Sequence, residues 1–250
     1  MEEILSQIGE MSPVLIMGLG LAIGLEHAFE PDHVAAVSTQ VSKGRFMQKS
    51  TKQIIKSGTM RSSILGAFWG AGHTTTLVLM GLLVYALAVK IEQNIFSSLE
   101  LIVGMMLIFL AITTISNKKI FKLRHRHPHQ HNDGSTHYDE HNHIDSEHKH
   151  SHKSYLIGCI HGLSGSGSLV VLTAATLNNV GMILGFILVF GIGSILGMAL
   201  VSGLMGVPFA LSNKVVRINK IARYIAGTFS LLIGANIIYQ ITIIDNLFGF

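Results

Sequence analysis

Ionisable residues gather in one short stretch of otherwise apolar sequence, GLEHAFEPDH at residues 24–33. Its titratable members are Glu26, His27, Glu30, Asp32 and His33. An ionisable side chain at the centre of a membrane helix costs at least ~2.5–3.5 kcal/mol, so such residues are usually kept for function. Imidazole suits nickel, cobalt, zinc and copper ions, and a carboxylate compensates part of their charge. We therefore predict a transition-metal site with ligands His27, Asp32 and His33, and Glu26 and Glu30 as secondary candidates.

Two further histidines lie in apolar segments and are candidates for the same site. His73, in AGHTTT, is the third imidazole that we expect to hold the ion, with Thr74 beside it as a secondary partner. His161, in HGLSGSGS, is a candidate fourth ligand or gate, and Ser164 adds to the polarity of that region. A single buried histidine often serves only as a hydrogen-bonding partner between helices, and this alternative stays open, above all for His161.

Pro31 determines the relative orientation of the side chains of His27 and His33. In a straight helix, His27 and His33 point roughly 120° apart and do not converge. Pro31 has no N–H, so the carbonyl of His27 loses its helical partner, and we expect the helix to kink or unwind between residues 27 and 31. Such a break is tolerated at membrane depth where it is buried or lines a watery cavity. Asp32 then falls in the first turn of the resumed helix.

The elements that must carry these residues are membrane helices. Of the 250 residues 49% are hydrophobic and 13% are charged, whereas a soluble domain carries about 25% charged residues. Each apolar segment is long enough for the roughly 20 helical residues that cross a bilayer. We predict six spans, at residues 14–37, 62–89, 97–116, 155–176, 181–207 and 221–244.

The basic residues predict the orientation of these spans. Every lysine and arginine except Lys90 lies in one of three loops, at residues 38–61, 117–154 and 208–223. These loops alternate along a chain of six spans, so they share one side, which the positive-inside rule makes cytoplasmic. We expect a multi-pass protein of the cell membrane with both termini outside. The basic charge is thus an orientation signal, and no nucleic-acid partner is expected.

Matched segments in the two halves predict an internal repeat. GLEHAF at 24–29 resembles GCIHGL at 158–163, FWGAGH at 68–73 resembles VFGIGS at 189–194, and IVGMMLI at 102–108 resembles IAGTFSL at 225–231. Three spans in each repeat place the halves in opposite orientation, as in many secondary transporters. The predicted fold class is an all-α polytopic membrane protein with six transmembrane helices as an inverted 3+3 repeat. Its parts are residues 1–116, a linker at 117–154, and residues 155–250.

The linker holds ten of the 14 histidines of the chain. They are His125, His127, His129, His131, His137, His141, His143, His148, His150 and His152. Interspersed acids and few apolar residues predict a disordered cytoplasmic segment. A tract of this composition binds metal, so we expect it to buffer the ion, although an inert hydrophilic spacer is the competing interpretation.

The motifs together resemble those of the nickel/cobalt transporter family. His27, Asp32 and His33 fit its H-x4-D-H signature, and Gly72-His73-Thr74 resembles its second motif. The segments HGLSGSGS and FGIGSILGM are more similar to compact six-span relatives, which include membrane proteins associated with urease maturation. The family's third motif is not found, and Ser202 stands near the place of an acid in the fourth. The resemblance implies permeation of Ni²⁺ or Co²⁺, as uptake.

These observations predict a secondary transporter and not an enzyme, with no catalytic cofactor and with Ni²⁺ or Co²⁺ as the transported ion. The chain lacks a Walker Gly-Lys-Ser/Thr sequence and the H-E-x-x-H of metalloproteases. Its single cysteine excludes dithiol redox chemistry. The expected partners are the divalent ion, the lipid bilayer and cytoplasmic nickel chaperones. Two alternatives remain, a nickel/cobalt efflux transporter and a membrane metal sensor or chaperone-docking protein that does not transport.

Overall fold

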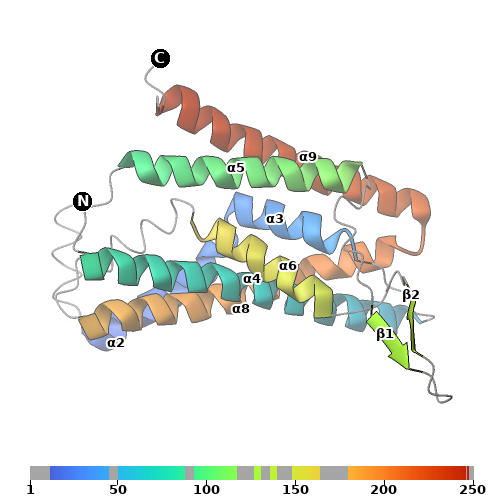
Figure 1. Ribbon diagram of the computed structural model, residues 1–250, viewed down its shortest axis with the longest axis horizontal. Coiled ribbons are helices and arrows are strands. Elements are labelled where there is room, and N and C mark those ends of the chain that lie inside the picture. Colours follow the sequence, from blue (N-terminus) through green and yellow to red (C-terminus); the bar gives the residue numbers. More distant parts are fainter. Residues whose placement is uncertain are drawn as a thin grey trace.

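The computed structural model describes residues 12–44, 50–87, 93–116, 127–130, 136–139, 148–163, 180–245 and 247. Its helices are α2 (Pro13–His27), α3 (Pro31–Val41), α4 (Thr51–Leu87), α5 (Gln93–Ile115), α6 (His148–His161), α8 (Val180–Ser212) and α9 (Val216–Tyr239), and α9 continues as the π-helix η1 (Gln240–Ile244). The long helices run roughly alongside one another (Figure 1). The predicted helical class is therefore confirmed for the body of the protein.

Several of these helices have the length and composition of membrane spans. Among the described residues, Ser97–Ile115, Gly181–Ser212 and Val216–Ile244 qualify alone, and helices α2 and α3 qualify together as one span bent by 54°. Helix α4 covers most of the predicted segment 62–89. The predicted fourth span is only partly described, because α6 ends at His161 and residues 164–179 lie outside the described part. The protein is thus a polytopic membrane protein, and the count of six remains a prediction.

Helix α8 shows how the bundle meets lipid. Large apolar side chains that recur every fourth residue are more than half exposed along one face, namely Leu188, Ile192, Leu196, Leu200 and Leu204. A soluble protein rarely exposes such a continuous apolar stripe. On the same helix Phe190, Ser194 and Met198 are buried. The helix therefore turns one face to the hydrocarbon and the other to the bundle.

The bundle is assembled from contacts between the two halves of the chain. Helix α8 packs against both α2 and α4, helix α6 packs against α4, and helix α9 packs against α5. Helix α3 contacts α5, α8 and α9, and in Figure 1 it lies among the longer helices. The short helix α3, which carries Asp32 and His33, is therefore held inside the bundle by helices from both halves.

Parts of two predicted basic loops, 38–61 and 208–223, lie near the end of α5. The side-chain amide of Asn213, after α8, donates to the carbonyl of Gly44, after α3, at 3.2 Å. The guanidinium of Arg223 donates to the carbonyl of Thr114, near the end of α5, at 2.8 Å. These contacts bring parts of the predicted loops 38–61 and 208–223 to the end of α5, and the common side of all three loops stays a prediction.

The histidine-rich linker contains ordered structure, which corrects the prediction that residues 117–154 are disordered throughout. Strands β1 (His127–Gln130) and β2 (Thr136–Asp139) pair antiparallel, with His129 opposite His137. Helix α6 begins at His148, inside the predicted linker. A hairpin needs only paired backbone groups, and a helix can extend beyond its apolar part, so a polar composition does not forbid either. His125, His131, His141 and His143 lie outside the described residues.

Candidate metal centre

The break between α2 and α3 is the feature that builds the site. Helix α2 ends at His27, Glu30 caps α3, and Pro31 is its first residue, with Asp32 in the first turn. The predicted break is therefore confirmed. The carbonyl oxygen of His27 accepts a hydrogen bond from Nδ1 of His33 at 2.8 Å. Because Pro31 has no N–H to donate to it, the carbonyl oxygen of His27 is available to orient the imidazole of His33.

Three imidazoles converge beside this break. Nε2 of His27 lies 3.1 Å from Nε2 of His73 on α4. The ring centroid of His33 lies 4.3 Å from that of His27 and 5.3 Å from that of His73. One ligand atom from each residue lies within 4.8 Å of the others, and all three side chains are buried. Two metal–nitrogen bonds of ~2.0–2.1 Å place their nitrogens about 3.0–3.4 Å apart, so this spacing suits a shared ion.

Hydrogen bonds fix which ring nitrogens would be available to an ion. A carbonyl oxygen only accepts, so Nδ1 of His33 carries the hydrogen, and its Nε2 is buried without a hydrogen-bond partner. Nδ1 of His27 lies 2.8 Å from a carboxylate oxygen of Glu30, and Nε2 of His27 lies within hydrogen-bond distance, 3.1 Å, of Nε2 of His73. A backbone carbonyl or a carboxylate behind the ligating imidazole is the usual arrangement in metal sites. The geometry therefore leaves Nε2 of His33 without a hydrogen-bond partner beside the rings of His27 and His73.

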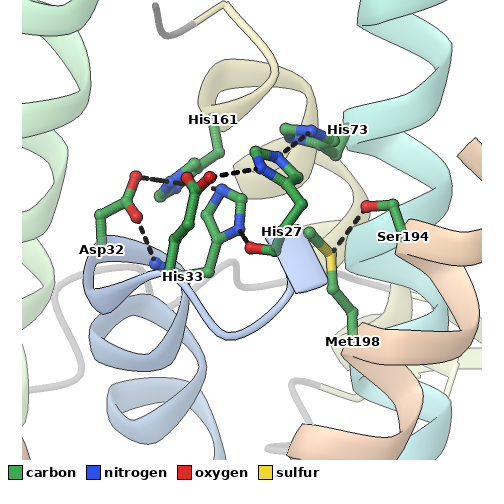
Figure 2. A network of polar contacts seen from close by, with 8 residues as sticks. His27, Asp32, His33, His73, His161, Ser194 and Met198 are labelled. Atoms are coloured by element: carbon green, nitrogen blue, oxygen red, sulfur yellow. Dashed lines mark hydrogen bonds and ion pairs between the residues drawn. The ribbon is translucent and has the colours of Figure 1, made fainter. Parts of the chain in front are cut away.

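Asp32 belongs to a second group of ligand atoms. Its Oδ2 lies 2.9 Å from Nε2 of His161 on α6 and 3.9 Å from Nε2 of His33. Asp32, His33 and His161 again place their ligand atoms within 4.8 Å of one another. The four ligands predicted from sequence are thus brought together, but as two groups that share His33. His161, a candidate fourth ligand or gate, completes the second group (Figure 2).

The other residues singled out in the sequence have different places. The side chain of Glu30 is 39% exposed and supports the site from behind, whereas Glu26 is exposed and lies in neither group. Thr74 donates from Oγ1 to the carbonyl oxygen of Gly191 at 3.2 Å, so it fastens α4 to α8. Ser164 lies outside the described residues.

Sequence reasoning overlooked the walls of the site. The ring of Trp69, fully buried, stands edge-on to the rings of His33 and His161, each at a centroid distance of 5.1 Å. The ring of Phe190 lies 5.3 Å from that of His27. Both aromatic residues directly precede a Gly-x-Gly of the matched segments FWGAGH and VFGIGS, which was the available signal. They place apolar rings against the histidines of the cluster.

Comparison with known proteins agrees with this membrane architecture. Residues 71–236 match the family described as the cytochrome C biogenesis protein transmembrane region. The chain is also 37% identical over 235 residues to the urease accessory protein UreH of Bacillus sp. (strain TB-90), an alignment that covers 93% of this chain and 94% of the relative. No solved structure matches. The similarity to UreH confirms the resemblance to compact membrane proteins associated with urease.

Proposed function

Because the chain belongs to the family of the urease accessory protein UreH, and to the membrane family of the cytochrome C biogenesis protein transmembrane region, we propose that it transports a divalent transition-metal ion across the cell membrane. Nickel is the first candidate and cobalt the second. Urease is a nickel enzyme, and the H-x4-D-H motif resembles that of nickel/cobalt transporters. The direction that the resemblance favours is uptake.

One observation carries this proposal: three buried imidazoles face one another at a helix break. His27 and His33 stand on either side of the break, and His73 comes from another helix. Nε2 of His27 and Nε2 of His73 share one hydrogen bond, whereas Nε2 of His33 and Nδ1 of His73 are buried without a partner. Burying such unpaired nitrogens is unfavourable unless a cation compensates for the lost hydration. Broken helices at membrane depth are also the usual place of transporter sites. An ion-binding site accounts for the break and for the histidines together.

The inverted 3+3 repeat is part of the proposal, and reciprocal contacts support it. A Cβ added to Gly24 on α2 would collide with the carbonyl oxygen of Phe190 on α8. A Cβ added to Gly158 on α6 would collide with the carbonyl oxygen of Trp69 on α4. Gly24 and Gly158 are matched positions of the two halves, and so are Trp69 and Phe190. Each half therefore repeats the same contact on the other half.

The third helix of each half follows the same rule. A Cβ on Gly104 of α5 would lie 3.2 Å from the carbonyl oxygen of Gly234 on α9. A Cβ on Gly227 of α9 would lie 3.3 Å from the carbonyl oxygen of Ala111 on α5. Gly104 matches Gly227, and Ala111 stands at the position that matches Gly234. Such exchange symmetry is expected if the halves arose by duplication.

The electrical gradient is a sufficient driving force. A charge of two crossing a potential of 100 mV gains about 4.6 kcal/mol, which corresponds to a concentration ratio of more than a thousandfold. With the basic end in the cytoplasm, an inside-negative potential draws the ion inward, toward the histidine-rich linker. The linker then buffers the arriving ion. Cytoplasmic nickel chaperones are the partners that would collect it.

Efflux is the second candidate, and the histidine-rich linker is the observation that favours it. Placed at the basic end, a metal-binding tract would equally well collect ions for export. A third kind of activity, redox transfer across the membrane by dithiol exchange, does not fit this sequence. Dithiol exchange needs two cysteines, and the chain has one, Cys159.

The test is ⁶³Ni²⁺ flux into proteoliposomes under an imposed inside-negative potential. The wild type should accumulate nickel, and His27→Ala should lose at least nine-tenths of that flux. Ser230→Ala is the matched control, because Ser230 is also buried and polar but donates to the carbonyl of Leu107, away from the histidines. Equal flux in His27→Ala and Ser230→Ala would disprove the site. Growing cells distinguish direction, since uptake raises and efflux lowers their nickel content.

A further inference from the structure

The two groups of ligand atoms share the imidazole of His33. His27, His33 and His73 form one group, and Asp32, His33 and His161 form the other. Nδ1 of His33 is held by the carbonyl of His27, so only Nε2 of His33 is available to a cation. One nitrogen lone pair binds one ion at a time. The two groups are therefore alternative positions for a single ion, and they lie next to each other.

The two positions differ in exposure and in ligand chemistry. In the first group all three residues are buried and all donors are nitrogen. In the second, the side chain of Asp32 is 17% exposed, whereas that of His161 is fully buried. A carboxylate oxygen is the harder ligand and suits a partly hydrated cation, whereas imidazoles suit a dehydrated transition-metal ion. The second position is thus the more exposed of the two.

We propose that Asp32, His33 and His161 form a second cation position, from which a divalent first-row metal ion passes to His27 and His73 while it stays bound to His33. This inference rests on the proposed transport function and deepens it. When the ion moves from the second group to the first, His27 and His73 replace Asp32 and His161 as ligands, and the bond to His33 is kept throughout. A ligand common to both positions avoids a fully dissociated intermediate in the membrane.

A simpler role for His161 must be separated from this one. Its Nε2 donates to Oδ2 of Asp32, so the imidazole could serve only to position the carboxylate. A glutamine side chain at position 161 also offers an N–H donor near this place, but it is a poor ligand for transition metals. His161→Gln therefore keeps the positioning hydrogen bond and removes the ligand. It should lose flux if His161 binds the ion, and keep flux if His161 only positions Asp32.

The binding test uses Co²⁺, whose visible absorption reports its ligands, and the full chain with the ten linker histidines replaced by glutamine. This parent should bind one Co²⁺ per chain. His73→Ala should still bind Co²⁺, about ten- to a hundredfold more weakly and with an altered spectrum, because the second position remains. His161→Ala should bind with affinity within about threefold of the parent, through the first position. The double variant His73→Ala/His161→Ala should lose binding altogether.

Three results would overturn the proposal. Loss of Co²⁺ binding in either single variant, in protein that stays helical and monodisperse, would mean one combined site. Wild-type nickel flux in His161→Gln would reduce His161 to a positioning residue. Retained binding in the double variant would place the ion elsewhere. Failure of transport is distinguishable, since a wild type that moves no nickel but whose variants bind Co²⁺ as predicted would refute the transport function and keep both positions.

Discussion

Replacing Gly162 by alanine tests whether the contact between α6 and α4 positions the candidate metal ligands. Gly162 directly follows His161, and a Cβ at this position would lie 2.7 Å from the carbonyl oxygen of His73 and 3.0 Å from Cβ of Thr76. Both neighbours belong to α4, and the nearer one is backbone, which cannot rotate away. The new methyl group must therefore separate the end of α6 from α4 at the level of the site.

The size of the effect follows from these distances. Ordinary contact begins at 3.4 Å, so a Cβ at 2.7 Å requires a shift of about 0.7 Å. Overpacking of this kind typically costs ~1–3 kcal/mol of stability. Functional constellations tolerate only ~0.5 Å of misplacement, and an error of 1 Å costs about a hundredfold in rate. We expect Gly162→Ala to lower nickel flux by about tenfold or more, because His161 and His73 move apart.

Nickel flux in proteoliposomes and thermal unfolding in detergent measure the two consequences. Gly18→Ala on α2 is the matched control, since a Cβ there meets nothing within 4 Å. It should keep wild-type flux and stability. If Gly162→Ala transports and unfolds like Gly18→Ala, the close approach of α6 to α4 does not position the site, and the reasoning is refuted.

Other substitutions test the supports of the site separately. Glu30→Ala removes the carboxylate behind His27 and should lower Co²⁺ affinity by about ten- to a hundredfold, as measured by equilibrium titration, whereas unchanged affinity would exclude a supporting role. Pro31→Ala restores an N–H at the break and should lower nickel flux by about tenfold, while Pro13→Ala, at the equivalent first position of α2, should leave flux unchanged. Gly158→Ala should lower the thermal unfolding temperature and the flux as Gly162→Ala does, and a stable, active variant would contradict the repeated glycine contact.

The part of the site that was predictable from sequence is the part encoded by covalent neighbours. Pro31 removes an N–H wherever it stands, so the break after His27 and the position of Asp32 in the next turn followed without knowledge of the fold. The burial of His73 also followed, because an imidazole in an apolar segment has no place in lipid unless it faces the bundle. The motif therefore identified every residue of the first group, His27, His33 and His73.

The partner of Asp32 was not predictable in the same way. His161 follows it by 129 residues and reaches it across a contact between α6 and the broken first helix. The helical pattern within either segment does not predict a contact between residues so far apart in the sequence. The two glutamates show the same limit at short range, since Glu30 turns toward His27 and Glu26 turns outward. Both glutamates have equally apolar neighbours in the sequence. Only the course of the chain at the helix break decides that one side chain points inward and the other outward.

Sequence by itself determined the membrane class, the helix break and the residue types of the candidate site, because each depends on composition or on bonds between near neighbours. Tertiary structure alone decided that the candidate ligands divide into two groups, that His33 belongs to both, and that Trp69 and Phe190 pack against them. Those features depend on how helices from opposite halves of the chain pack. Packing of this kind is a property of surfaces that meet only in the folded protein.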